Sequence, residues 1–133
     1  AFTAPALHAQ TAWPTQTVRF VNNFPAGGPS DILARSVSQV LQEATKQSFV
    51  VENKPGAAGN IGAADVAKAA GDGNTLLFGI DTTFTINPHL YPNQGFKVSD
   101  LKPVIVMASS GMLIGVNPST GIKTLTQLVE QSK

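Results

Sequence analysis

The 133-residue sequence contains no cysteine. This absence excludes disulfide bonds, thiol nucleophiles, thiolate metal sites and a lipid anchor on an N-terminal cysteine. Charge is also scarce, since charged residues make up 13% of the chain and the formal net charge is +1. The nine lysines and arginines stand singly, so no basic surface gathers nucleic acid or an anionic bilayer. We therefore expect no nucleic-acid partner.

Motifs for catalysis and for cofactors are missing as well. The sequence has no GxxxxGK[ST], and Gly56, Gly59 and Gly62 do not have the spacing of a GxGxxG turn after a strand. It has no metal-ligand cluster and no motif for an activated serine. Asp81 and His89 can be imagined as a catalytic pair, but a lone histidine is more often a packed or surface residue. We expect no enzyme activity, no catalytic residue, no cofactor and no metal ion.

The rest of the composition suits one α/β domain with many turns, with 42% hydrophobic residues, 12 glycines and nine prolines. No stretch has the roughly 18 consecutive apolar residues that span a membrane. Residues 1–12 are small, apolar or uncharged, and they resemble the tail of a secretory signal with its cleavage region. We interpret them as that tail, which implies export, or else as a disordered N-terminus.

Strand-like and helix-like segments alternate along the chain. The pattern predicts strands at residues 17–24, 49–52 and 75–80 and helices at residues 29–46 and 63–70. Alternating strands and helices form a parallel sheet with right-handed crossovers. The predicted fold class is α/β, a parallel βαβαβ sheet with helices on both faces, whose ligands bind beyond the carboxyl ends of the strands. Two further strands are predicted at residues 103–108 and 112–116, and a helical pattern at residues 124–131.

The turn after the first strand has features of an anion site. Gly27 and Gly28 permit a tight turn, Pro29 suits the first helical position, and the free amides of a helix N-terminus attract anions. At this turn, and again at Gly59 and Gly62, a ligand oxygen can approach the backbone without meeting a Cβ. Neutral donors follow the strands: the hydroxyls of Ser30, Thr82 and Thr83 and the amide of Asn60, which can also cap a helix. The alternative is that these residues only form turns and caps, with Asp31 as a helix N-terminal charge rather than a general base.

Five stretches carry a resemblance to a known family: Trp13-Pro14, residues 18–31 with the turn Phe24-Pro25-Ala26-Gly27-Gly28-Pro29-Ser30-Asp31, residues 51–62, residues 72–77 and residues 86–91. In these stretches the chain resembles the tripartite tricarboxylate transporter substrate-binding proteins, the Bug or TctC family of bacterial periplasmic receptors. The stretches run in order through most of the chain. The sequence departs from the family at Asn74, where Tyr is common, and at Ala58, where Gly is frequent.

The resemblance implies one lobe of a type II periplasmic-binding-protein (Venus-flytrap) fold in the periplasm of a Gram-negative bacterium. Such a receptor captures a small organic mono-, di- or tricarboxylate between two lobes and passes it to membrane transporter subunits. The residues expected to contact the ligand are Phe24, Ala26, Gly27, Gly28, Ser30, Asp31, Asn60, Asp81, Thr82 and Thr83. Because the Asp81 carboxylate would repel an anion, we expect it to bind water or a ligand amine or hydroxyl, or to cap Thr83.

The resemblance also divides the chain. Residues 1–12 are the signal tail or disordered N-terminus, 13–103 the first lobe, 104–117 the hinge strands and 118–133 the start of a truncated second lobe. With half of the site missing, we expect the chain alone to bind carboxylates weakly. Exposed apolar residues at the hinge, such as Ile105, Met107 and Leu113, could promote dimerisation or strand exchange. The alternatives are a small α/β enzyme acting on an anionic substrate and a protein-interaction or sensor module.

Overall fold

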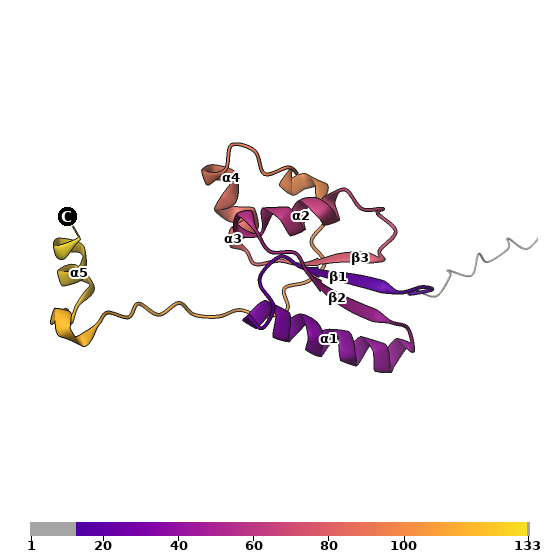
Figure 1. The fold of residues 1–133 in the computed structure, drawn as a ribbon, viewed down its shortest axis with the longest axis horizontal. Coiled ribbons are helices and arrows are strands. Elements are labelled where there is room, and N and C mark those ends of the chain that lie inside the picture. Colours follow the sequence, from indigo (N-terminus) through magenta and orange to yellow (C-terminus); the bar gives the residue numbers. More distant parts are fainter. Residues whose placement is uncertain (1–12, 133) are drawn as a thin grey trace, which may run out of the picture. The chain divides into compact units, whose positions relative to one another are not determined.

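The computed structural model describes residues 13–132. These residues form two units that divide after Lys102 (Figure 1). The interpretation of residues 1–12 as a signal tail lies outside the described residues. No helix within residues 13–132 is long and apolar enough to cross a membrane.

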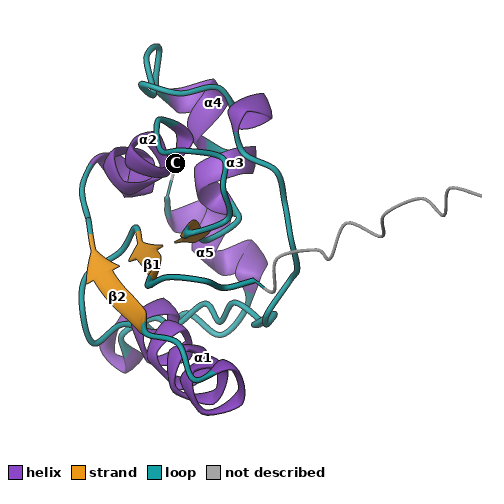
Figure 2. Ribbon diagram, turned by 90° about the vertical axis from the view of Figure 1, so that its right-hand side faces the viewer, coloured by secondary structure: helices purple, strands orange, loops and turns teal. Residues whose placement is uncertain are grey.

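The first unit is built on a parallel sheet of three strands in the order β2-β1-β3. Its main elements are β1 (Val18–Asn22), α1 (Pro29–Thr45), β2 (Phe49–Asn53), α2 (Asn60–Ala67) and β3 (Thr75–Phe78). Helix α1 contacts β1 and β2, whereas α2 contacts β1 and β3 on the opposite face (Figures 1 and 2). The predicted parallel βαβαβ sheet with helices on both faces is confirmed.

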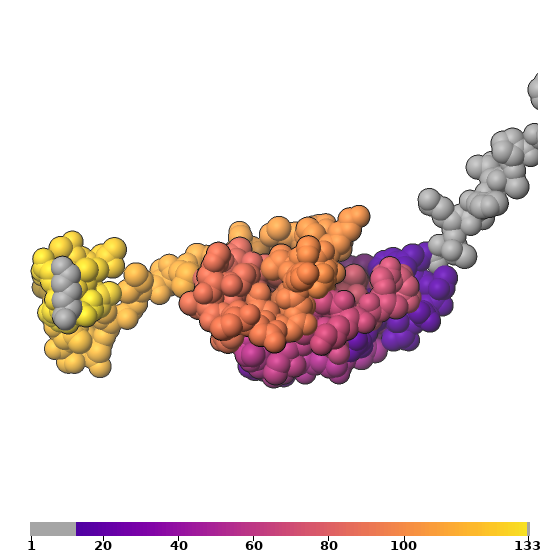
Figure 3. Space-filling model, turned by 90° about the horizontal axis from the view of Figure 1, so that it is seen from above, coloured from indigo at the N-terminus to yellow at the C-terminus, as the bar shows by residue number. Residues whose placement is uncertain are grey.

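Several short helical segments complete the described chain. They are the 3₁₀ helices η1 (Ala57–Gly59), η2 (Val98–Asp100) and η3 (Pro118–Thr120) and the helices α3 (Thr82–Thr85), α4 (Asn87–Leu90) and α5 (Leu125–Gln131). In the space-filling view of the first unit, the segment that includes α3 and α4 lies beside α2 on the surface (Figure 3).

The core of the first unit lies between the sheet and α1. Period-two alternation along β1 turns Val18 and Phe20 toward this helix, and both side chains are buried. The Phe20 ring lies 5.3 Å from that of Phe49 on β2 and 4.9 Å from that of Phe78 on β3. Burying a side chain of this size contributes about 1.5–3 kcal/mol, so this aromatic cluster joins all three strands.

Two glycines let α2 approach the carboxyl end of β1 closely. A Cβ on Gly59, whose φ is +91°, would lie 2.5 Å from Nδ2 of Asn23 and 2.8 Å from Oγ1 of Thr83. A Cβ on Gly62 would lie 2.8 Å from Cβ of Asn23. Protein atoms therefore fill the space that we expected a ligand oxygen to use at Gly59 and Gly62, and this expectation was wrong.

The second unit, within residues 103–132, has no strand. The two strands predicted at residues 103–108 and 112–116 are absent, because an isolated strand without a paired neighbour gains no ladder hydrogen bonds. The apolar side chains that suggested them are exposed, with Val104 at 80% and Leu113 at 98%. The role of residues 104–117 as a hinge stays a prediction.

The close approach of α2 to β1 yields a test. Gly59→Ala places a side chain at a positive φ and against Asn23, so it is expected to lower the free energy of unfolding by about 2 kcal/mol or more. Gly71→Ala is the matched control, since a Cβ there meets no atom within 4 Å. Urea denaturation measures both. Equal stability of the Gly59→Ala variant and the wild-type chain would show that this approach is not tight.

Candidate functional site

The strand order places two turns side by side at one edge of the sheet. From β1 the chain crosses to β2 on one side, and from β2 it returns to β3 on the other side of β1. Because β1 and β3 are parallel neighbours, their carboxyl ends lie together at this edge of the sheet. Residues 23–31 and 79–83 follow β1 and β3 and flank this point.

The first turn is closed by its own hydrogen bonds. Gly27 has a φ of +81°, in the left-handed region that favours glycine. The Gly28 amide donates to the carbonyl oxygen of Pro25 at 3.4 Å, and the Gly27 amide donates to Oδ2 of Asp31 at 2.9 Å. Both amides were expected to bind a ligand, and both already have partners within the protein.

Asp31 lies buried in the first turn of α1, and its side chain supports the turn after β1. Its Oδ2 also accepts a hydrogen bond from Nε of Arg35 at 3.0 Å, and its Oδ1 accepts one from Nδ2 of Asn53 at 2.8 Å. The hydrogen bonds from Arg35, from the Gly27 amide and from Asn53 lower the pKa of the Asp31 carboxyl to about 2. Both carboxylate oxygens of Asp31 already accept hydrogen bonds from the protein. The carboxylate therefore serves to hold the turn after β1 in place.

Donors without partners remain at the same turn. The backbone amides of Ala26, Ser30 and Asp31 donate no hydrogen bond within residues 13–132, and neither does the hydroxyl of Ser30. Two of these amides lie in the first turn of α1, which has 17 residues and begins with Pro29. The positive end of the helix dipole and these free N–H groups suit a small anion. The predicted residues Ala26 and Ser30 thus carry open donors, whereas Phe24 contributes a carbonyl held by Asn22 and Asn53.

The second turn brings three predicted residues to the end of β3. Asp81 is exposed and its side chain makes no capping hydrogen bond. The idea that it caps Thr83 was wrong, because the Thr83 amide donates to the carbonyl oxygen of Ile80 at 3.1 Å. The Thr82 hydroxyl has no partner within the described residues and is half-buried. The Thr82 hydroxyl is therefore an open donor on the second turn, in addition to those on the first.

Thr83 serves the structure of the site. Its fully buried hydroxyl accepts from Nδ2 of Asn23 at 3.1 Å and donates to the carbonyl oxygen of Ala58 at 3.4 Å. The same Asn23 amide group donates to the carbonyl oxygen of Gly59 at 3.1 Å. These bonds join the ends of β1 and β3 to the start of α2, so Asn23 and Thr83 set the spacing of the two turns.

Asn60 belongs to the same buried group of amides. It was predicted to cap α2, but Gly59 is the N-cap residue and Asn60 is the first residue of the helix. Its Oδ1 accepts from Nδ2 of Asn87 at 2.9 Å and from Nε2 of Gln94 at 3.1 Å, while its buried Nδ2 has no partner within residues 13–132. Sequence reasoning missed Asn23, Asn87 and Gln94. The Asn22-Asn23 pair at a strand end was the one signal for them.

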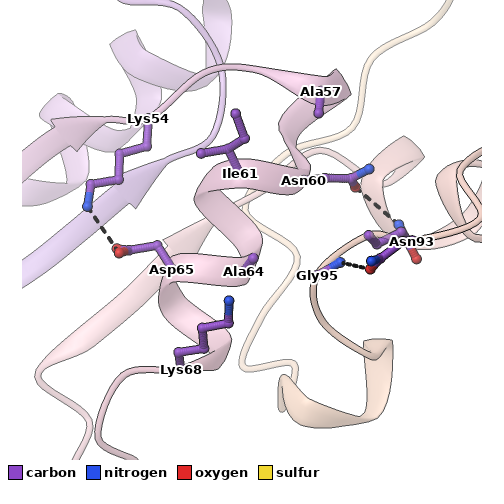
Figure 4. A pocket seen from close by; sticks show the side chains of 10 residues that line it. Lys54, Ala57, Asn60, Ile61, Ala64, Asp65, Lys68, Asn93 and Gly95 are labelled. Carbon is purple, nitrogen blue, oxygen red and sulfur yellow. Dashed lines mark hydrogen bonds and ion pairs between the residues drawn. The ribbon is translucent and has the colours of Figure 1, made fainter.

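A hollow lies elsewhere, on the outer side of α2 (Figure 4). It has a volume of about 540 Å³ and includes Lys54, Asp65, Lys68 and Gln94 in its lining. The Lys54 ammonium is paired with Asp65 at 3.1 Å and with Glu52 at 3.3 Å, which offsets its charge. Of the residues predicted to contact a ligand, Asn60 lines this hollow, whereas no residue of the turn after β1 and none of residues 81–83 does.

The burial of Asp31 sets a pH test. Its folded pKa is about 2, below the ordinary 3.8, so its stabilising effect is present above about pH 4 and is lost as the pH falls through 2. Asp31→Asn should lower the unfolding temperature at pH 7, and the difference from wild type should shrink toward pH 2. Circular dichroism melts at pH 7, 4 and 2.5 measure this. A difference that does not depend on pH would contradict the assigned role of the charge.

The chain is similar to known proteins in both sequence and fold. The model of the TctC family, the tripartite tricarboxylate transporter family receptors, matches residues 33–133. A UPF0065 protein of Bordetella pertussis is 32% identical over 130 residues, which are 98% of this chain and 40% of that protein. A solved R. palustris protein with adipate is 39% identical, with a TM-score of 0.63 over 65% of this chain and 29% of that one. The periplasmic binding protein BugD is also 39% identical, with a TM-score of 0.57 over 64% of this chain and 28% of its own.

These similarities agree with the observed sheet. The chain spans about 40% of the length of the curated relative, and its structural neighbours are periplasmic binding proteins. The parallel sheet with helices on both faces corresponds to one lobe of such a protein. With its family model matched over residues 33–133, the chain belongs to the TctC family of tripartite tricarboxylate transporter receptors.

Proposed function

We propose that this chain is the ligand-binding lobe of an exported solute-binding protein that works in the periplasm. It captures a small organic carboxylate for a membrane transporter, at the edge formed by the carboxyl ends of β1 and β3. The observation that carries the proposal is the set of open donors at that edge: the amides of Ala26, Ser30 and Asp31 and the hydroxyls of Ser30 and Thr82.

These donors suit a carboxylate without help from a lysine or arginine. A hydrogen bond to a charged group contributes on the order of 1.5–3 kcal/mol, so a few convergent ones hold an anion. The buried carboxylate at the site, Asp31, is paired with Arg35, which limits its repulsion of a ligand. The exposed carboxylate of Asp81 stands at the second turn, where a hydroxyl or amine on the ligand would meet it better than a second anion.

The ligand class is a small dicarboxylate or related organic acid. Support comes from the family, whose members are tripartite tricarboxylate transporter receptors, and from the R. palustris relative that was solved with adipate. One lobe contacts only one side of such a ligand and leaves the other side hydrated. We therefore expect a dissociation constant well above the micromolar range for this chain alone.

The proposal also covers self-association of the second unit. Its apolar side chains are exposed, with Ile105 at 72%, Met112 at 97% and Leu113 at 98%. Exposed apolar side chains of this kind favour contact with another copy.

Leu113→Lys tests this contact. The added charge is expected to weaken self-association about tenfold or more, as measured by sedimentation equilibrium. Ser109→Lys, at an exposed polar position of the same segment, adds the same charge as a control. A wild-type chain that stays monomeric at high concentration removes this part of the proposal.

Adipate titration followed by amide NMR tests carboxylate capture. The amides of Ala26, Ser30, Asp31 and Thr82 are expected to shift, and Ser30→Ala should weaken binding about threefold to tenfold because one hydroxyl donor is lost. Ser36→Ala is the matched control, because its exposed hydroxyl donates to the carbonyl oxygen of Ile32 on α1. Shifts confined to Lys54, Lys68 and their neighbours in the hollow on α2 would refute the proposed site.

A further inference from the structure

Side chains from three elements hold the turn after β1 in place. At the start of the turn, the carbonyl oxygen of Phe24 accepts hydrogen bonds from Nδ2 of Asn22 on β1 at 3.0 Å and from Nδ2 of Asn53 on β2 at 3.4 Å. Further along the turn, the Gly27 amide donates a hydrogen bond to Oδ2 of Asp31 on α1 at 2.9 Å. The conformation of the turn is therefore fixed by the protein itself.

Two of these side chains form a closed ring with Arg35, which we name the Asp31–Asn53–Arg35 triad. Asn53 donates to Oδ1 of Asp31 at 2.8 Å and accepts at its Oδ1 from a terminal guanidinium nitrogen of Arg35 at 3.1 Å. The ring closes through Nε of Arg35, which lies 3.0 Å from Oδ2 of Asp31. The fork of the guanidinium group thus contacts both partners at once, a geometry that a lysine ammonium does not reproduce.

The charges of the triad are placed unequally. The Asp31 side chain is 5% exposed, whereas the Arg35 side chain is 54% exposed. The carboxylate therefore lies beneath the turn that carries the open donors, and the cation that balances it lies at the surface. Without Arg35, a buried negative charge would face an anionic ligand across this turn with no cation paired to it.

We propose that Asn53 and Arg35 are positioning residues for carboxylate capture: they hold the Asp31 carboxylate, which shapes the donor-bearing turn, and Arg35 cancels its repulsion of the ligand. This inference rests on the proposed function of the same turn. Its energetic basis is preorganisation, because a turn held ready without ligand needs little ordering when the ligand binds.

The test uses the full 133-residue chain with adipate as the probe. Arg35→Ala is expected to weaken adipate binding by on the order of tenfold, measured by amide NMR titration. Lys102→Ala is the matched control, since it removes the same charge from an exposed residue that belongs neither to the turn after β1 nor to the lining of the hollow on α2. Arg35 is more than half exposed, so its removal leaves the core intact, and thermal melts verify this.

Two further variants separate positioning from general stability. Arg35→Lys restores the charge without the fork, so it should regain part of the lost affinity. Asp31→Asn combined with Arg35→Ala removes both charges but keeps a side-chain oxygen at position 31 that can accept the hydrogen bond from the Gly27 amide. It should therefore bind adipate more tightly than Arg35→Ala alone. A purely structural role predicts the opposite order for the double variant, and that order would overturn the inference.

The outcomes distinguish this inference from the proposed function. If wild-type chain binds adipate and Arg35→Ala binds it equally well, the triad has no role in capture. If wild-type chain does not bind adipate, the proposed function fails. The positioning of the turn is then judged by exchange of the Gly27 amide proton, which should accelerate in Asn53→Ala and Arg35→Ala but not in Lys102→Ala. Unchanged exchange in both triad variants would contradict it.

Discussion

A buried carboxylate beneath a glycine-rich turn is the interaction on which the proposed binding edge depends. Asp31 accepts hydrogen bonds from the backbone of its own turn, from the neighbouring strand β2 and from Arg35 one helical turn later. The Gly27 amide is thus bonded within the protein, whereas the amides of Ala26, Ser30 and Asp31 have no partner within residues 13–132. The negatively charged Asp31 thus supports a turn whose open amides suit an anionic ligand. This is compatible because the Arg35 guanidinium offsets the charge of Asp31.

The strand order gives this turn a neighbour. Since β1 is central between β2 and β3, the connections after β1 and β3 meet at one edge, and the buried amide of Asn23 joins them through Thr83. The close packing that Gly59 and Gly62 permit brings α2 to the same place. Membership of the TctC family is consistent with this edge as a receptor surface.

Local patterns were sufficient to predict the three strands, the helix α1 and the turn with Pro29 at its first position. The second helix was predicted at residues 63–70, three positions later than α2 at Asn60–Ala67. The partners of the polar side chains were not predictable, because they are set by tertiary contacts. Asn23 and Thr83 are 60 positions apart, and Asn53 and Asp31 are 22 apart. The same limit explains the error at residues 103–116, where apolar, β-branched sequence predicted strands that have no pairing partner in the described chain.

The most direct measurement of the central claim is a crystal structure of the chain soaked with adipate. The account predicts a carboxylate group within hydrogen-bond distance of the amides of Ser30 and Asp31, with Asp31 still bonded to Gly27 and Arg35. A carboxylate bound instead in the hollow on α2 beside Lys54 and Lys68, with the turn after β1 unoccupied, would contradict it.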